Sequence, residues 1–202
     1  LYIIANPGQF ADNWLEALYP WIGGFFVLGS ILGVLIAVPL YLRLIKAPIF
    51  PIMDLAGLYA PVLQAIARLG CLGAGCCYGA AAPGLWWAIT FTHPGSNAPC
   101  NIPLHPTQLY ISIASLLIFF ILQASAKKLL ARPGALLFLY LMLENISRIT
   151  IDLWRGDREP FVASLFQGSV QLSQAQLYAL ITLAVACCGF IIVWFKKSTA
   201  PK

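Results

Sequence analysis

Three long runs without a charged residue constrain the fold of this chain more than any other feature. They cover residues 17–42, 106–126 and 170–195. Each run is long enough to cross a bilayer as a helix, because a span needs roughly 20 apolar residues. Apolar residues in these runs do not alternate with a period of two, so helices rather than a closed barrel are predicted to satisfy the backbone in lipid. The sequence therefore indicates a membrane protein.

Two further apolar runs, at 49–69 and 134–154, are also predicted to span the bilayer although they contain ionisable residues. Only 9% of the chain is charged, whereas soluble domains average about 25%, so lipid is expected to cover most of the surface. We predict an all-α fold, a polytopic transmembrane helical bundle with five spans. It forms a single integral membrane domain over 1–202, with an outer loop or head region at 70–105. The ionisable residues in these two spans are Asp54, Arg68, Glu144, Arg148 and Asp152.

The distribution of Lys and Arg predicts the orientation of the spans, because these residues are enriched in cytoplasmic loops. Strict alternation of five spans places eight of the twelve basic residues on one side, and the loop at 71–105, which has none, on the other. We therefore predict an outer N-terminus and a cytoplasmic C-terminus. The same distribution explains the net charge of +5 without nucleic acid as a partner. The eight residues are Arg43, Lys46, Lys127, Lys128, Arg132, Lys196, Lys197 and Lys202.

The ionisable residues of the 134–154 run share one helix face, since Glu144, Arg148 and Asp152 recur every four residues and Arg155 continues the series. One interpretation is an internal ladder of salt bridges that joins helices. The other is an anion site near the outer leaflet, because ionisable groups in spans usually serve function. In that site Arg68 and Arg148 would bind a lipid phosphate in a bidentate fork, oriented by the two acidic side chains.

Two motifs flank the outer loop. Residues 68–79 read RLGCLGAGCCYG, and their glycines permit turns and let backbone N–H groups face an anion. A tight transition from helix to loop is the simpler interpretation. Residues 105–110 read HPTQLY, which is typical of a helix N-terminus and can also face an anion.

The order of these motifs resembles a known family. Gly23-Gly24 comes first, then Arg68-Leu-Gly with the Gly-rich loop, then HPTQLY at 105–110, and then Arg148-x-x-x-Asp152-x-x-Arg155. This order resembles the prolipoprotein diacylglyceryl transferase family, bacterial enzymes that move diacylglycerol from phosphatidylglycerol to a lipoprotein thiol. The likeness covers about residues 20–195. It implies a seven-helix inner-membrane fold, and because the chain begins with Leu1 rather than Met, we expect an N-terminal segment to be missing or removed.

The resemblance also implies a site and its ligands. Phosphatidylglycerol or another anionic phospholipid would bind in it, a lipoprotein precursor would supply the attacking thiol, and no cofactor or metal ion is expected. The protein would lie in the bacterial inner membrane with a periplasmic active face. The expected catalytic residues are Arg68, Arg148, His105 and Tyr78. The expected substrate-binding residues are Gly70, Gly75, Gly79, Gln108, Tyr110, Asp152 and Arg155.

Three departures from the family pattern concern proton transfer. Leu28 stands where the family has a histidine, Ile111 replaces an acid, and the Gly-rich loop has Cys71, Ala74 and Cys76 in place of its asparagines and acid. His105 or Tyr78 could substitute as the base. The alternative is a non-catalytic relative, a structural or accessory lipid-binding subunit of a larger membrane complex.

The cysteines leave three interpretations open. A disulfide is expected among the four outer cysteines if the outer side is oxidising. A membrane thiol–disulfide protein is the functional version of that idea. Zinc bound with His93 or His105 is a weaker alternative, because Cys-x4-Cys-Cys is not a familiar zinc spacing. The outer cysteines are Cys71, Cys76, Cys77 and Cys100, and Cys187 and Cys188 are expected to be small apolar residues of a span.

Overall fold

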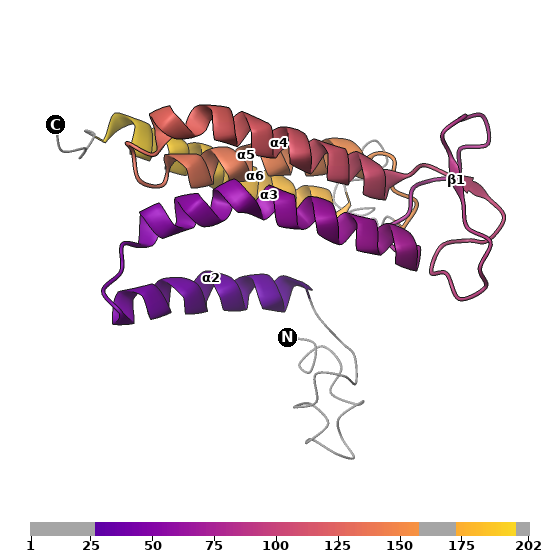
Figure 1. Cartoon of the computed structure of the whole chain (residues 1–202), viewed down its shortest axis with the longest axis horizontal. Helices are drawn as coiled ribbons and strands as arrows, with labels where there is room; N and C mark the ends of the chain where they lie inside the picture. Colours follow the sequence, from indigo (N-terminus) through magenta and orange to yellow (C-terminus); the bar gives the residue numbers. More distant parts are fainter. Residues whose placement is uncertain (1–26, 158–172, 197–202) are drawn as a thin grey trace, which may run out of the picture. The chain divides into compact units, whose positions relative to one another are not determined.

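The computed structural model of the chain describes residues 27–157 and 173–196, which form two compact units divided after Ile49. The described structure is mostly helical, with one small sheet (Figure 1). The helices are α2 (Val27–Leu44), α3 (Ile49–Ala74), α4 (Thr107–Leu129), α5 (Ala135–Asp152) and α6 (Gln174–Phe195), and the strands are β1 (Ile89–Thr90) and β2 (Pro103–Leu104).

The first unit contains α2, which covers residues 27–42 of the span predicted at 17–42 and continues for two more residues to Leu44. The beginning of that span lies outside the described residues. Pro39 is inside the helix, a position that membrane helices tolerate more readily than soluble ones. Arg43 stands in the last turn, and Lys46 follows in a left-handed conformation with φ of 55°.

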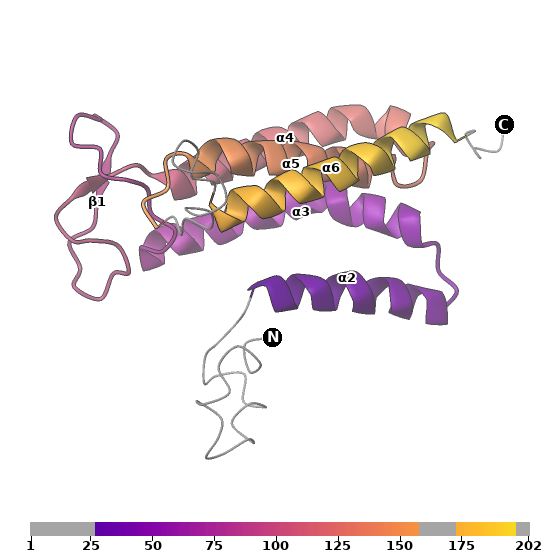
Figure 2. The same cartoon turned by 180° about the vertical axis from the view of Figure 1, so that it is seen from behind.

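The second unit is a bundle in which α5 packs against both α4 and α6 (Figure 2). The connection from α4 to α5 meets the end of α6, because Arg132 donates a hydrogen bond to the carbonyl of Trp194 and lies 4.3 Å from the centroid of its indole. The buried core of the bundle comes from α3, α4 and α5: Leu58, Ile118, Leu122, Ala126, Leu129, Ala135 and Leu136.

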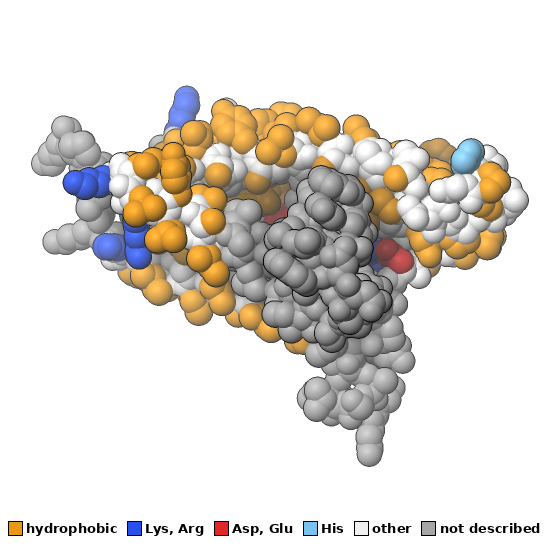
Figure 3. Space-filling model, turned by 90° about the horizontal axis from the view of Figure 1, so that it is seen from below, with side chains coloured by type: hydrophobic (Ala, Val, Ile, Leu, Met, Phe, Trp, Pro, Cys, Tyr) orange, Lys and Arg blue, Asp and Glu red, His pale blue; other side chains and the backbone are white. Residues whose placement is uncertain are grey.

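The surface of the bundle is suited to lipid. Within residues 27–157 and 173–196, three helices are long and apolar enough to cross a membrane: Ile49–Ala74, Thr107–Leu129 and Ala175–Phe195. At most 33% of the apolar 18-residue stretch of each helix is buried in the protein. Hydrophobic side chains cover long stretches of the face drawn in Figure 3. A water-soluble protein would not leave so many large apolar side chains exposed. The chain is therefore a membrane-embedded helical protein.

Glycine lets the helices approach closely at two contacts, as is common where helices pack in lipid. A Cβ atom on Gly57 of α3 would lie 3.3 Å from the Cα of Leu137 in α5. A Cβ on Gly189 of α6 would collide with the ring of Phe138. Larger residues at these two positions would push α3 and α6 away from α5.

Asp54 of α3 binds the beginning of α5. Its side chain is 1% exposed, and its carboxylate accepts hydrogen bonds from the backbone N–H groups of Gly134 (2.6 Å) and Leu137 (2.8 Å). These N–H groups have no partner within their own helix, and the positive end of the helix dipole favours a carboxylate there. Asp54 thus caps a helix that begins 81 residues later in the sequence.

The structure differs from the sequence prediction at the end of the second span. The helix was expected to stop at residue 69, but α3 continues to Ala74. Gly70 and Gly73 therefore lie within a helix, and a Cβ atom on either would meet no other atom within 4 Å. The expectation that these two glycines permit turns or close approach is wrong, whereas Gly75 has a φ of 69° and does form the turn.

Candidate functional site

Three arginines meet in one polar pocket where α3 and α5 end. The pocket is lined by Arg68 from α3, by Arg148 and Asp152 from α5, and by Arg155 just beyond α5. The helical repeat aligns the α5 residues on one face, as the sequence predicted. The remaining lining residues are Gln64, Ile111, Glu144, Ser147 and Ile151.

The acidic side chains of the pocket bind neighbouring segments. Glu144 Oε1 accepts a hydrogen bond from Gln64 Nε2 at 2.7 Å, and this joins α5 to α3. The carboxylate of Asp152 accepts a hydrogen bond from the hydroxyl of Ser173 at 2.6 Å. Ser173 also caps α6, because it forms a capping box with Gln176. The two carboxylates therefore hold the ends of α3, α5 and α6 around the arginines.

The three arginines differ in their partners. Arg155 forms a bidentate ion pair with Asp157 (2.7 and 2.8 Å), and this carboxylate raises the pKa of the guanidinium. Arg68 donates to the sulfur of Cys77 at 3.4 Å. The guanidinium of Arg148 makes no hydrogen bond or ion pair with any residue in 27–157 or 173–196. A guanidinium that has no hydrogen-bond or ion-pair partner inside a membrane carries a large free-energy cost, so Arg148 is suited to bind an anionic ligand.

An apolar groove of about 560 Å³ lies beside the polar pocket. Ile151 of α5 lines both spaces. The groove is bounded by α4, the end of α5 and the head region, through Trp87, His105, Tyr110, Ile113, Ala114, Leu117, Ile151 and Trp154. The polar pocket is much smaller, about 10 Å³, which is room for about one water molecule. The two spaces share the wall that Ile151 forms.

Aromatic side chains form one end of this groove. Trp87 Nε1 donates to the hydroxyl of Tyr110 at 2.7 Å, and His105 Nδ1 lies 3.2 Å from the same oxygen. The ring of Tyr110 also contacts Trp154 in an edge-on arrangement. Amphipathic rings of this kind are enriched where the bilayer meets water. His105 therefore faces the groove, and it does not line the arginine pocket.

The HPTQLY motif holds the Gly-rich loop by its backbone. Thr107 Oγ1 donates to the carbonyl of Cys77, and Gln108 Nε2 donates to the carbonyl of Cys76, both at 2.8 Å. The two donors are at most 1% exposed. The first turn of α4 thus positions the loop that follows α3, and the described contact of Gln108 is with this loop.

Gly79 packs against His105 at a distance that excludes any side chain. Its N–H donates to the carbonyl of His105 at 3.1 Å, and a Cβ on Gly79 would overlap that same carbonyl. On the other side, Gly156 N–H donates to the carbonyl of Tyr78. Gly79 therefore joins three segments that are distant in the sequence.

Replacement of Gly79 by alanine is expected to separate these segments. Overpacking that must move backbone costs typically about 1–3 kcal/mol, so the Gly79→Ala variant should show a lower free energy of unfolding. It should also show faster amide hydrogen exchange over residues 76–81. Gly84→Ala is the matched control, because a Cβ on Gly84 meets nothing within 4 Å. Equal stability of the two variants would contradict this account.

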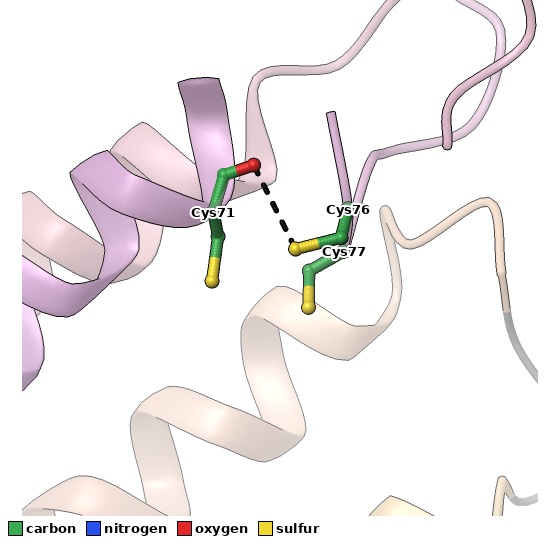
Figure 4. A group of neighbouring side chains, drawn as sticks. All are labelled: Cys71, Cys76 and Cys77. Carbon is green, nitrogen blue, oxygen red and sulfur yellow. Dashed lines mark hydrogen bonds between the residues drawn. The ribbon is translucent and has the colours of Figure 1, made fainter. Parts of the chain in front are cut away.

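Three thiols lie close to one another at the end of α3 (Figure 4), and one of them, Cys77, accepts the hydrogen bond from Arg68. Cys71 lies in the last turn of α3, and Cys76 and Cys77 lie in the loop that follows. Their sulfur atoms are all within 4.8 Å of one another. Burial, a hydrogen bond with Cys71 and the neighbouring thiols raise the pKa of the Cys76 thiol to about 11, so it carries a proton at neutral pH.

All six cysteines are free in the structure, so the expected disulfide stays a prediction. Cys100 is not part of the three-thiol group, and its thiol donates to the carbonyl of His93. Nδ1 of His93 in turn accepts from the N–H of Gly95. Among the described residues neither histidine joins the three thiols, so the zinc arrangement that included His93 or His105 is not formed.

The structure brings together only part of the predicted site. Arg68, Arg148, Asp152 and Arg155 share one pocket, whereas His105 and Tyr110 line the groove. Tyr78 lines neither space. Sequence reasoning missed Gln64, Thr107, Trp87 and Ser173. A polar residue four positions before Arg68 in an apolar run, and the capping-box pattern Ser173-x-x-Gln176, were the signals that could have revealed two of them.

Comparison with known proteins shows the family of this chain. Residues 1–194 match the sequence profile of prolipoprotein diacylglyceryl transferase. The chain belongs to the prolipoprotein diacylglyceryl transferase family. A phosphatidylglycerol–prolipoprotein diacylglyceryl transferase of Clostridium tetani is 34% identical over 198 residues, which cover 98% of this chain and 75% of that protein.

Similar relatives occur in other bacteria. The transferase of Dehalococcoides mccartyi is 34% identical over 202 residues, and that of Thermotoga petrophila is 29% identical over 223 residues. The matches cover all of this chain, 70% of the first protein and 66% of the second. The chain thus spans about two thirds to three quarters of the length of these family members. The resemblance to this family that the sequence motifs indicated is confirmed.

Proposed function

We propose that this chain transfers diacylglycerol from phosphatidylglycerol to the cysteine thiol of a lipoprotein precursor. Relatives that carry this activity in their names align with nearly the whole chain. The observation that carries the proposal is the polar pocket, in which Arg68 and Arg148 line one space and Arg148 has no partner among the described residues. A phosphodiester would supply the anion that this guanidinium lacks.

The apolar groove supports a phospholipid as the occupant rather than a free phosphate. A diacylglyceryl group needs a large apolar surface, and the groove of about 560 Å³ provides it next to the arginines. Trp87 and Tyr110 would lie at the level of the head groups. The lipid would then place its phosphate on the arginine side of Ile151 and an acyl chain on the other side.

The reaction requires charge stabilisation and removal of one proton. The thiol sulfur attacks the glycerol carbon that bears the phosphate oxygen, so a C–S bond forms as the C–O bond breaks. The electron pair of that bond leaves with the phosphate, as glycerol 1-phosphate, and the thiol proton passes to a base. Arg68 and Arg148 would stabilise the charge that develops on the leaving phosphate. Glu144 and Asp152 would keep in place the helix ends that carry the two arginines, through their hydrogen bonds to Gln64 and Ser173.

We also propose five spans, with the described site at the periplasmic face of a bacterial inner membrane and the C-terminus in the cytoplasm. The contact of Arg132 with Trp194 supports this orientation, because it places the start of α5 and the end of α6 together at the end of the bundle opposite the arginine pocket. Lys127, Lys128 and Lys196 lie at that same end, as expected for a cytoplasmic side.

A transfer assay with the purified chain tests the proposed activity. Detergent-solubilised protein would receive phosphatidylglycerol with labelled acyl chains and a peptide that contains a lipobox cysteine. We expect the label on the peptide as a thioether, release of glycerol 1-phosphate, and no reaction with a peptide in which serine replaces the cysteine. A chain that binds phosphatidylglycerol but transfers nothing would contradict catalysis and favour the accessory subunit of a membrane complex.

A further inference from the structure

The three thiols of Cys71, Cys76 and Cys77 form a group that lines neither the arginine pocket nor the apolar groove. It combines residues from two segments, Cys71 at the end of α3 and the pair Cys76 and Cys77 in the next loop (Figure 4). All three are partly exposed, so solvent and ligands can reach them. A single disulfide would use two of the sulfur atoms and leave the third unexplained.

We propose that Cys71, Cys76 and Cys77 bind one zinc ion whose fourth position accepts the thiol of the lipoprotein precursor. The binding of the precursor thiol at the fourth position rests on the proposed function. The binding of zinc by the three cysteines does not depend on that function. Catalytic zinc sites have three protein ligands and one open position. Thiolate ligands suit zinc.

The geometry of the thiols fits this proposal. Zinc binds thiolate sulfur at about 2.3 Å, so a tetrahedral ion requires sulfur atoms about 3.8 Å apart. The three sulfur atoms lie within 4.8 Å of one another, and small side-chain rotations would close the difference. The dashed line in Figure 4 marks the contact of the Cys76 sulfur with the carbonyl of Cys71. This contact joins the loop to the end of α3.

The backbone at Cys77 is held in an unfavourable conformation. Its φ is 57°, a left-handed value that residues with a side chain rarely adopt. The hydrogen bonds of Thr107 and Gln108 to the carbonyls of Cys77 and Cys76 fix this conformation. Such strain is concentrated at ligand sites, where it aims a side chain. Here it directs the Cys77 sulfur towards Arg68.

The charge of the surroundings also fits. Zinc with three thiolates carries one negative charge, and a fourth thiolate adds another. Arg68 donates to the Cys77 sulfur at 3.4 Å, and Arg155 is close enough to interact with it electrostatically. The same Arg68 lines the pocket proposed for the phosphate, so a thiol on the zinc would lie near the lipid head group.

The zinc site would supply the removal of the thiol proton. The family has a histidine at the position of Leu28, and this chain lacks it. A zinc-bound thiol loses its proton, here to water, without a protein base. The bound sulfur then attacks the glycerol carbon, the C–S bond forms as the C–O bond breaks, and the electron pair leaves with glycerol 1-phosphate. The product is a neutral thioether, a weaker ligand than a thiolate, so it would dissociate. Zinc does not change its oxidation state.

Metal analysis of the full chain tests the site independently of activity. Protein purified in detergent with a non-thiol reductant should contain about one zinc ion per chain. Each of the variants Cys71→Ser, Cys76→Ser and Cys77→Ser should bind zinc roughly 100-fold more weakly or worse. Cys100→Ser is the matched control and should retain the metal. Absence of bound zinc after titration, or a disulfide that joins two of the three cysteines in protein from native membranes, would overturn the site.

Cobalt(II) in place of zinc tests the open position. Its absorption reports the number of thiolate ligands, so we expect a spectral change when a lipobox peptide is added and none with the serine peptide. Chelation should abolish diacylglyceryl transfer, and zinc should restore it. Transfer that persists in metal-free protein and in Cys77→Ser overturns this inference but leaves the proposed function intact. Zinc binding with no transfer by any form would instead contradict the proposed function.

Discussion

Replacement of Arg148 by alanine is expected to lower the rate of diacylglyceryl transfer by about 100- to 1,000-fold, the usual effect of removing one group that stabilises transition-state charge. The variant should remain folded, because the guanidinium makes no hydrogen bond or ion pair with another described residue. Binding of phosphatidylglycerol should also weaken. Steady-state transfer kinetics, together with co-purified lipid measured by mass spectrometry, would give both quantities.

A second variant at position 148 separates the effect of charge from that of geometry, and a variant at position 128 serves as the control. Arg148→Lys keeps the positive charge but loses the planar fork, so its activity should lie between wild type and the alanine variant. Lys128→Ala removes a positive charge at the opposite end of α4 and should leave the rate unchanged. If Arg148→Ala retains full activity, Arg148 does not stabilise the phosphate in the transition state, and the role proposed for the arginine pocket is wrong.

Replacement of Asp54 by alanine is expected to cause the largest loss of stability. Two backbone N–H groups at the start of α5 would lose a charged acceptor while they remain buried. The loss should amount to about 2–4 kcal/mol, since each charge-assisted hydrogen bond contributes about 1.5–3 kcal/mol and caps typically about 1 kcal/mol. Unfolding in mixed micelles by a denaturing detergent would measure it.

Asp54→Asn is the informative companion to this variant. The amide keeps one acceptor oxygen and a similar shape but carries no charge, so an intermediate loss is expected. A loss in Asp54→Asn as large as in Asp54→Ala would assign the stabilisation to the charge near the helix dipole. If neither variant differs from wild type, the carboxylate does not determine how α3 and α5 pack.

Helices were predictable from the sequence because long apolar runs leave the backbone few other choices in lipid. The end of α3 was not predictable in this way. Its last turn contains Gly70 and Gly73, which local propensity treats as helix breakers, yet the helix continues to Ala74. The hydrogen bonds that fix the following loop come from Thr107 and Gln108, which are 30 and 32 residues from the carbonyls they bind, and no local pattern contains that information.

The candidate site also has a part that local sequence patterns predict and a part that they do not. The face shared by Glu144, Arg148 and Asp152 follows from the helical repeat, so the sequence predicted it. The prediction that Arg155 continues this helix face is wrong, because α5 ends at Asp152. The sequence also paired Arg68 with Arg148, because both lie near the outer leaflet in their predicted spans. The meeting of Cys71 with Cys77 depends on a left-handed residue at the end of α3, which the spacing of the cysteines does not reveal.

The cap on α5 has a consequence for how the protein is made. Asp54 leaves the ribosome long before Gly134, its hydrogen-bond partner 80 residues later. Until α5 emerges, α3 carries a carboxylate that bare acyl chains cannot solvate. Release of α3 alone into lipid is therefore energetically costly. We expect α3 to stay at a hydrated site, or beside another helix, until α5 has been made.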